Sequence, residues 1–228
     1  MEHREIWVAE LGLVDYVEAL QLQEQLRDAR IDGEIPDVLL LLEHPAVITR
    51  GRRTGDEPLP AGADVIDVDR GGKATWHGPG QLVGYPIFAA EDVVRHVRLI
   101  ERAIVDALAQ VGVDARARVQ DGPDYTGVWV AERKIASIGV HVRRGVATHG
   151  FAVNVVNRLA AFEEFNPCGL DAVRMTSLQR EAPGACERGT VCIGRRVASR
   201  LCDLHGARRR NVGAARVTRI AAREALTA

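Results

Sequence analysis

Lysine, cysteine and aromatic residues are scarce in this chain of 228 residues. Of its 30 basic residues, 28 are arginine, and the two lysines are Lys73 and Lys134. The longest uninterrupted apolar run, 38–42, is far shorter than the roughly 18 residues that a membrane span needs, so a membrane-spanning class is excluded. Residues 1–12 lack an apolar segment behind a basic start, and we therefore expect no secretory signal and a cytoplasmic location.

The four cysteines lie in the last part of the chain, at Cys168, Cys186, Cys192 and Cys202. Without an export signal they are expected to be thiols rather than a disulfide framework. The spacing of the last three together with His205 matches none of the usual zinc sites, so no metal site is predicted.

Charge is distributed unevenly along the chain. Residues 1–179 hold 19 basic and 27 acidic groups, whereas residues 180–228 hold 11 basic and 4 acidic ones. The basic segment contains no aromatic residue on which a base could stack, so we expect a solvated tail, with a nucleic-acid binder as the alternative. We divide the chain into a catalytic domain, 1–179, and a basic C-terminal appendage, 180–228, that is either packed on the domain or partly disordered.

Hydrophobic periodicity predicts helices and strands that do not alternate strictly. The pattern predicts amphipathic helices over 14–30 and 93–112, and a buried strand over the apolar run 37–45. Three strand-like runs joined by short links indicate a meander or hairpins, at 127–132, 134–142 and 147–155. The fold class is therefore α+β, with a mixed, mostly antiparallel sheet packed with helices.

The stretch 69–87, DRGGKATWHGPGQLVGYPI, concentrates five glycines in nineteen positions. Gly71 and Gly72 allow a positive φ or direct contact between backbone and ligand. Thr75 and His77 are two residues apart in an extended segment and therefore point to the same side. The phosphate-binding patterns GxxxxGK[ST] and GxGxxG are absent, and the alternative to a ligand site is a glycine-rich turn between strands.

Two further positions carry groups that are suited to catalysis. Cys168 lies between Pro167 and Gly169, which favours a loop that presents the thiol as a nucleophile; the alternative is an inert buried cysteine. Lys134 begins an otherwise apolar strand, and the alternative there is a lysine that protects an edge strand. In a chain that uses arginine for nearly every cation, lysine suits a role that requires loss of a proton, because arginine keeps its proton.

Residues 70–81, RGGKATWHGPGQ, resemble the signature R-G-G-x-x-T-aromatic-H-x-P-G-Q of the lipoyl(octanoyl) transferases. Four other stretches resemble further blocks of that family in the right order: LLEHPAVITRG upstream, then RKIASIGVHV, THGFAVNV and FNPCGLDAVRMTSL. The resemblance covers residues from about 38 to 178 and ends before the basic tail.

The resemblance implies an α+β fold that is shared with lipoate ligases and with the catalytic domain of biotin ligases. It implies an acyltransferase in which Cys168 takes up an octanoyl group as a thioester. Lys134 as ammonium would stabilise the thiolate, and as free amine it would accept a proton from the attacking lysine. The substrate-binding residues that the resemblance implies are Arg70, Gly71, Gly72, Lys73, Ala74, Thr75, Trp76, His77, Ser137, Ile138, Gly139, Gly150, Phe151 and Ala152. We expect His77 to cap the reacting end of the acyl tunnel.

The resemblance also implies the substrates. The donor would be octanoyl–acyl carrier protein, and the acceptors would be lipoyl domains of 2-oxoacid dehydrogenases and the glycine cleavage H protein, in the first step of endogenous protein lipoylation. No cofactor, membrane or nucleic acid is expected to take part. The alternatives are an ATP-dependent lipoate–protein ligase, which needs no covalent cysteine, and a non-catalytic carrier-binding protein on the same fold. Docking of an acidic carrier would need a basic patch, with candidates at Arg50, Arg52, Arg53, Arg143, Arg144 or the tail.

Overall fold

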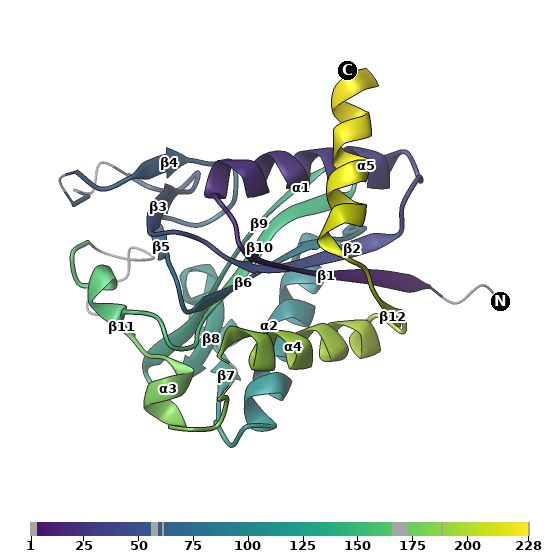
Figure 1. Ribbon diagram of the computed structural model, residues 1–228. Coiled ribbons are helices and arrows are strands. Elements are labelled where there is room, and N and C mark those ends of the chain that lie inside the picture. Colours follow the sequence, from purple (N-terminus) through teal and green to yellow (C-terminus); the bar gives the residue numbers. More distant parts are fainter. Residues whose placement is uncertain (1–3, 56–58, 61, 166–172, 188, 228) are drawn as a thin grey trace.

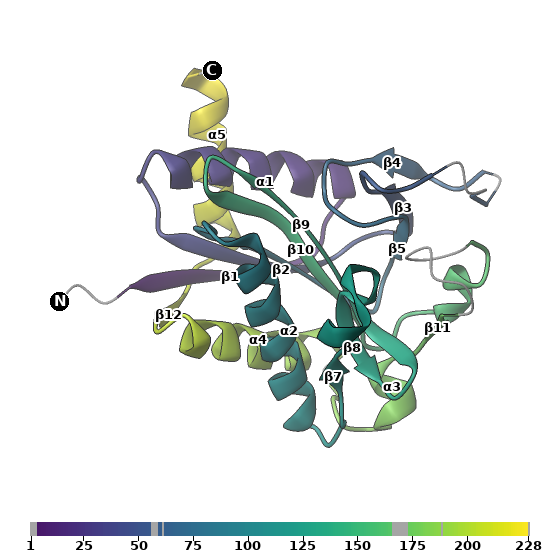
Figure 2. The ribbon, with the colours of Figure 1, turned by 180° about the vertical axis from the view of Figure 1, so that it is seen from behind.

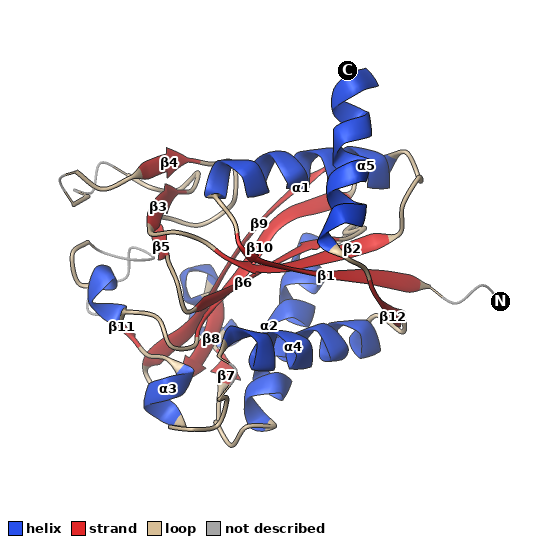
Figure 3. Ribbon diagram, viewed as in Figure 1, coloured by secondary structure: helices blue, strands red, loops and turns tan. Residues whose placement is uncertain are grey.

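A large mixed sheet forms the centre of the protein (Figure 1, Figure 3). The computed structural model describes residues 4–55, 59–60, 62–165, 173–187 and 189–227. The strands of the central sheet are β1 (Glu5–Leu13), β2 (Asp37–Glu43), β6 (Gln81–Ile87), β7 (Arg116–Ala117), β8 (Gly127–Val130), β9 (Arg133–Arg143), β10 (Val146–Asn154), β11 (Arg174–Met175) and β12 (Arg208–Asn211). Within the described ranges their order is β12-β1-β2-β6-β10-β9-β8-β7, with β11 paired to β9.

Two pairs of helices cover the two faces of this sheet (Figure 1, Figure 2). Helices α1 (Tyr16–Ile31) and α5 (Ala214–Thr227) pack on one face, and α2 (Val93–Ala109) and α4 (Thr190–Leu204) pack on the other. The central strand β2 shows why both faces are apolar. Leu39 and Leu41 join the core under α2 and α4, whereas Leu40 and Leu42 join the core under α1 and α5. The unbroken apolar run is therefore a strand that is buried on both sides.

The predicted fold class is confirmed. The two predicted helices correspond to α1 and α2, and each begins at an aspartate that caps it. The carboxylate of Asp15 accepts hydrogen bonds from the backbone N–H groups of Val17 and Glu18, and that of Asp92 accepts one from Arg95. The three predicted strand-like runs are β8, β9 and β10, which pair in antiparallel order.

A smaller sheet lies beside one end of the central sheet (Figure 3). It consists of β4 (Val65–Asp67), β3 (Val47–Arg50) and β5 (Thr75–His77), in that order. Trp76 of β5 packs in a third apolar cluster with Phe162, Phe165 and Met175. This cluster connects the small sheet to β11, to which Met175 belongs. The remaining described helical turns are η1 (Val119–Asp121), η2 (Pro123–Tyr125), η3 (Leu159–Phe162) and α3 (Leu178–Glu181).

The described part of the segment after residue 179 packs against the same sheet. Ile193, Val197 and Leu201 of α4 belong to the core under α2, and β12 pairs in parallel with β1. The division of the chain into a catalytic domain and an appendage stays a prediction. None of the described helices has the length and apolar character needed to cross a membrane.

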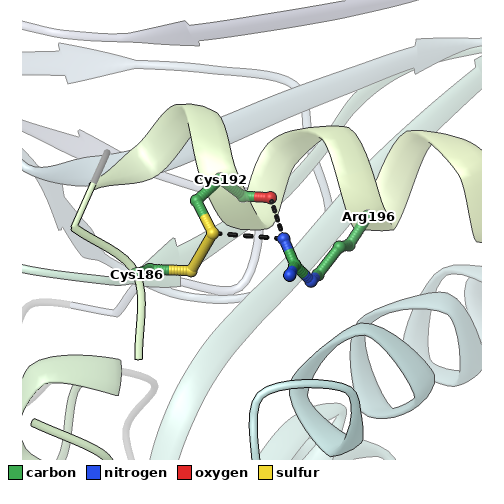
Figure 4. Close-up of a disulfide and its surroundings, with 3 residues drawn as sticks. All are labelled: Cys186, Cys192 and Arg196. Atoms are coloured by element: carbon green, nitrogen blue, oxygen red, sulfur yellow. Dashed lines mark hydrogen bonds between the residues drawn. A yellow bond between two sulfur atoms is a disulfide. The ribbon is translucent and has the colours of Figure 1, made fainter. Parts of the chain in front are cut away.

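The prediction that the cysteines are thiols was wrong for two of them. Cys186 and Cys192 form a disulfide at the start of α4, with their Cα atoms 5.7 Å apart (Figure 4). The guanidinium of Arg196 donates hydrogen bonds to the carbonyl oxygen and to Sγ of Cys192. The prediction rested on the missing export signal, whereas the two residues, six positions apart in sequence, lie at a bridging distance. Cys202 is a buried free thiol.

Candidate active site

The glycine-rich segment is held by the guanidinium of Arg70, which is 7% exposed. Its Nη1 donates to the carbonyl oxygens of Gly71 and Lys73 at 3.0 and 2.8 Å. Its Nη2 donates to the carbonyl oxygen and the hydroxyl of Thr49 at 2.9 and 2.7 Å. One buried cation therefore ties the loop to itself and to β3, with geometry that the planar fork of arginine provides.

The loop also lies directly on β9. The backbone N–H of Gly71 donates to the carbonyl oxygen of Val140 at 3.0 Å. A Cβ atom on Gly139 would lie 2.8 Å from the carbonyl oxygen of Gly71, and one on Gly51 would lie 2.5 Å from that of Gly72. Glycine is required on both sides of the loop because the backbones approach too closely for any side chain.

The structure brings two of the predicted stretches into direct register. In the β9–β10 pair, Gly150 lies opposite Gly139, Phe151 opposite Ile138, and Ala152 opposite Ser137. Together with the glycine-rich loop they line a narrow, open-mouthed cavity of about 70 Å³. The residues predicted from sequence that line it are Arg70, Gly72, Lys73, Ala74, Thr75, His77, Lys134, Ser137, Ile138, Gly139, Gly150, Phe151 and Ala152.

Two of the predicted residues lie elsewhere. Gly71 contributes backbone contacts to β9 rather than cavity wall. The indole of Trp76 points into the apolar cluster, where it meets Phe162 edge to face with ring centroids 5.5 Å apart. Alternation along β5 explains this, because Thr75 and His77 face the cavity and Trp76 faces away.

Lys134 is 2% exposed and lines the cavity from the start of β9. Strand β9 lies between β10 and β8, so Lys134 does not protect an edge strand. Its Nζ lies 5.3 Å from the ring centroid of Trp129, a cation–π distance, and a Cβ atom on Gly127 would lie 2.8 Å from its Cε. Both lysines of the chain, Lys73 and Lys134, are therefore at this cavity.

The predicted nucleophile, Cys168, lies outside the described residues. The described residues that flank the segment 166–172 contact strands around the cavity. Phe165 packs in the cluster around Trp76, and Met175 pairs with Lys134 in the β11–β9 ladder. Within the described ranges, no group of three or more His, Cys, Asp or Glu side chains is arranged to hold a metal ion.

The sequence reasoning missed several buried polar residues around the cavity. Tyr16 from α1 and Tyr85 from β6 reach it only through the tertiary fold. Nδ1 of His44 donates to the carbonyl oxygen of Val14 at 2.7 Å, and its Nε2 accepts from the hydroxyl of Tyr85 at 2.7 Å. Burial lowers the pKa of His44, and burial raises the pKa of Tyr16 to about 12. The groups are therefore neutral near pH 7.

His149 was also missed, although it directly precedes Gly150. Its φ is +57°, in the left-handed region that is uncommon for residues other than glycine and is often found at functional sites. Its backbone N–H donates to Oε1 of Gln23 in α1, at 2.7 Å, instead of to a neighbouring strand. Its ring Nε2 donates to Asp69 at 2.7 Å, which is the first cause that lowers the pKa of Asp69 to about 2. Burial lowers the pKa of His149 itself.

Comparison with known proteins assigns the family. Residues 15–192 match the lipoyl protein ligase A/B catalytic domain. The octanoyltransferase of Rhodococcus jostii (strain RHA1) is 50% identical over 186 residues, which are 77% of this chain and 72% of that protein. The chain belongs to the octanoyltransferase family. Octanoyltransferases are acyltransferases, so the protein is an enzyme of that class.

Solved structures show how widely this fold is used beyond the octanoyltransferases. The bipartite lipoate protein ligase of Thermoplasma acidophilum superposes with a TM-score of 0.72 at 15% identity, over 97% of this chain and 92% of that one. The biotin protein ligase of Aquifex aeolicus superposes with a TM-score of 0.51 at 11% identity, over 88% and 69%. At these identities the likeness extends to the fold alone, and the predicted relation to lipoate and biotin ligases is confirmed at that level.

Proposed function

We propose that the protein transfers an octanoyl group from octanoyl–acyl carrier protein to a lysine ε-amine of a lipoyl domain, through a thioester on Cys168. The observation that carries the proposal is the placement of Lys134. This buried cation lines the cavity, and its strand pairs with β11, which begins two residues after the segment 166–172 that contains Cys168. Membership of the octanoyltransferase family supports the acyl group.

The two half-reactions would use one exchangeable proton. In the first, the Cys168 thiolate attacks the thioester carbonyl, the bond to the carrier sulfur breaks, and the leaving thiolate takes a proton from the Lys134 ammonium. In the second, the acceptor amine attacks the acyl-enzyme, the bond to Sγ breaks, and Lys134 takes the proton that the amine loses. The cycle ends with the thiolate and ammonium with which it began. Arginine at position 134 could stabilise the thiolate but could not exchange the proton.

The cavity supplies an apolar wall for the acyl chain. Val83, Ile138, Phe151 and Ala152 line it beside the polar residues of the glycine-rich loop. Burial of each methylene of the chain contributes about 0.8 kcal/mol to binding. The acyl group would lie along the β9–β10 pair, with its carbonyl carbon near Lys134.

Among the basic residues considered for carrier docking, the geometry favours Arg53. Its side chain is half exposed and lines the cavity, where it donates a hydrogen bond to Asp124 at 2.9 Å. Arg143 lies nine residues along β9 from Lys134, which corresponds to about 30 Å. Reversal of charge at Arg53 would therefore raise KM for the carrier more than the same change at Arg143.

The proposal is tested by intact-protein mass spectrometry after mixing with octanoyl–acyl carrier protein. We expect an octanoyl adduct that hydroxylamine removes, that is absent from Cys168→Ala, and that transfers to an added lipoyl domain. Lys134→Ala should slow both formation and transfer. An adduct that survives in Cys168→Ala would contradict the thioester step.

A parallel reaction with free octanoate and ATP separates the transferase from a ligase. Modification of the lipoyl domain that depends on ATP, with no adduct on the wild-type enzyme, would overturn the proposal in favour of an ATP-dependent lipoate–protein ligase.

A further inference from the structure

A chain of buried hydrogen bonds leads from His77 of β5, in the cavity wall, to Thr176, the residue after β11. Nδ1 of His77 lies 2.8 Å from Oε1 of Gln81. Nε2 of Gln81 donates to Oδ1 of Asn154 at 3.0 Å and to the carbonyl oxygen of Trp76 at 3.2 Å. Nδ2 of Asn154 donates to the carbonyl oxygen of Thr176 at 3.0 Å. His77, Gln81 and Asn154 are 6%, 2% and 2% exposed, so this chain of hydrogen bonds lies in the interior of the protein.

The direction of every bond in the chain is fixed, because both amides bond to backbone carbonyl groups, which only accept. The Thr176 carbonyl makes the nitrogen of Asn154 the donor and leaves its Oδ1 as an acceptor. Gln81 donates to that oxygen and to the Trp76 carbonyl, so its Oε1 must accept. The proton between Oε1 and His77 therefore belongs to Nδ1 of His77. A neutral ring in this tautomer carries a bare lone pair on Nε2.

The surroundings keep the ring of His77 neutral. Burial lowers its pKa to about 3, and the neighbouring His44 and Arg70 act in the same direction. Tyr16 stacks on the ring with centroids 5.9 Å apart. The ring lines the cavity while its Nδ1 edge is occupied by Gln81. A fixed acceptor nitrogen is therefore built into the wall of the candidate active site.

The other histidine that lines the cavity is arranged differently. His149 donates through Nε2 to Asp69, and its bare Nδ1 is enclosed by protein. His44 has the same Nδ1–H tautomer as His77, but its Nε2 already accepts the hydroxyl of Tyr85. Among the described histidines, His77 is thus the one that combines a bound Nδ1–H, an Nε2 that accepts no hydrogen bond from the described residues, and a place in the cavity wall.

We propose that Nε2 of His77 accepts a hydrogen bond from the amine of the acceptor lysine and orients it for attack, and that Gln81 and Asn154 are positioning residues that hold this tautomer. The inference rests on the function proposed above. The thioester group of the donor has only acceptor atoms, and the first N–H of its pantetheine arm lies two carbons beyond the sulfur, whereas the attacking amine brings N–H groups to the carbonyl carbon itself. An acceptor nitrogen in the wall therefore matches the second substrate better than the first. A hydrogen bond from N–H to Nε2 also leaves the nitrogen lone pair of the amine free to attack.

Adduct formation and transfer can be measured separately, which distinguishes a role of His77 in orienting the amine from a general loss of activity. The acyl-enzyme is formed with octanoyl–acyl carrier protein in a single turnover, and a lipoyl domain is then added while both steps are followed by intact mass. We expect His77→Ala to form the adduct at a rate within about threefold of wild type and to transfer it roughly 10- to 100-fold more slowly. Equal slowing of both steps, or unchanged transfer, would overturn the inference while the proposed function stands. Absence of the adduct from the wild-type enzyme would overturn both.

A matched control is available in α2. His96 is 3% exposed, and neither of its ring nitrogens makes a hydrogen bond within the described part of the chain. It lines a different cavity, beside Arg4 and His205. His96→Ala therefore removes a buried imidazole of similar exposure from a distant place, and both half-reactions should keep their wild-type rates.

The positioning residues are tested by the tautomer itself, which does not depend on activity. Long-range proton–nitrogen NMR spectra of the wild-type enzyme should show His77 protonated at Nδ1 and bare at Nε2 at neutral pH; the opposite tautomer or an imidazolium ring would overturn the inference. In Gln81→Leu we expect a mixture of tautomers and slower transfer with unchanged adduct formation. Loss of transfer without a tautomer change in Gln81→Leu would contradict the positioning role.

Discussion

The cavity and the β12 edge of the central sheet hold their positive charges in opposite ways. At the cavity, Arg70 donates to backbone carbonyls and Lys134 lies against the indole of Trp129, both almost fully buried. At the β12 edge, Arg195 pairs with Glu10 at 2.8 Å, and Arg208 pairs with Glu5 at 3.1 Å, with the arginine side chains half exposed or more. The first arrangement depends on the identity of each cation, whereas in the second any cation of similar reach would serve.

The difference explains how a chain with two lysines distributes them. Lys73 and Lys134 both line the cavity, and the arginines described at the β12 edge make surface ion pairs of the kind that contributes little to stability. In the proposed mechanism a proton moves to and from Lys134, which an amine allows and a guanidinium does not, whereas a fixed surface charge needs no such exchange. This difference between the two regions is tested by replacing lysine with arginine at the cavity and arginine with lysine at the β12 edge.

The largest effect is expected for Lys134→Arg, compared with Arg208→Lys. Arginine retains the charge but cannot take the proton of the acceptor amine, so transfer to the lipoyl domain should fall roughly 10²- to 10⁴-fold. Arg208→Lys should keep wild-type rates, because its pair with Glu5 lies on the surface. Steady-state transfer assays and thermal melts of both variants measure this. Transfer by Lys134→Arg within a few-fold of wild type would show that the proton goes elsewhere.

The next effect is on stability, for Arg70→Met. Methionine fills part of the volume but leaves the carbonyl oxygens of Gly71, Lys73 and Thr49 without their buried donor. Each unsatisfied buried acceptor costs about 1–3 kcal/mol, so we expect a loss of about 3 kcal/mol or more in the free energy of unfolding. Urea unfolding checks this, with Arg208→Met as the surface control. A loss in Arg70→Met no larger than in the control would refute the clamp.

A smaller effect is expected for Gly139→Ala. The added methyl would lie 2.8 Å from the carbonyl oxygen of Gly71 and 3.2 Å from Cδ of Arg70, so the glycine-rich loop must move away from β9. Overpacking of this kind costs about 1–3 kcal/mol, and we expect a raised KM for the donor because the cavity wall is displaced. Gly213 is the matched control, since an added Cβ there would meet nothing within 4 Å. Equal stability and KM in the two variants would contradict the close approach.

Part of the fold could be predicted from the sequence. The elements with a strong hydrophobic pattern were predicted at the right positions. The apolar run around Leu40, the periodic helix of α2 and the three strands β8, β9 and β10 follow from periodicity. The glycine-rich signature and the block around Ser137 were expected near one site, and the β9–β10 register joins them to Gly150. Local pattern carries this information because the apolar residues of each element mark the face or faces that it buries.

The rest depends on contacts between distant residues. Strand β12, of sequence RRRN, has no apolar alternation and is held by its ladder to β1, so its sequence predicted no strand. The positive φ of His149 likewise accompanies a bond from its backbone N–H to the distant Gln23. The bridge between Cys186 and Cys192 is local, and it was missed because the sequence shows no export signal. Tyr16, Gln81 and Asn154 are brought together only by the packing of α1, β6 and β10. The amide and hydroxyl network around the cavity was therefore beyond single-sequence reasoning.

A modest effect is expected from pH at the pair of Asp69 and His149. The hydrogen bond from His149 is the first cause that lowers the pKa of Asp69 from 3.8 to about 2, so this carboxylate contributes stability above pH 4 that is lost as pH falls toward 2. Burial lowers the pKa of His149, so protonation of that ring in acid acts in the same direction. Asp69→Asn should flatten the acid side of the stability curve between about pH 4 and 2, measured by urea unfolding. Because the carboxylate is half exposed, the change should be small. A curve as steep as that of wild type would place the acid sensitivity elsewhere.

The smallest effect is expected for the pair of Arg195 and Glu10 at the β12 side of the sheet. The two groups make a bidentate contact at 2.8 and 3.1 Å, but both are well exposed, and solvent and salt screen the attraction. A double-mutant cycle of Arg195→Ala and Glu10→Ala should show no coupling beyond experimental error in the urea midpoint, and all three variants should keep wild-type transfer. A measurable coupling, or slower transfer, would mean that this edge takes part in function and would remove the distinction between the two regions.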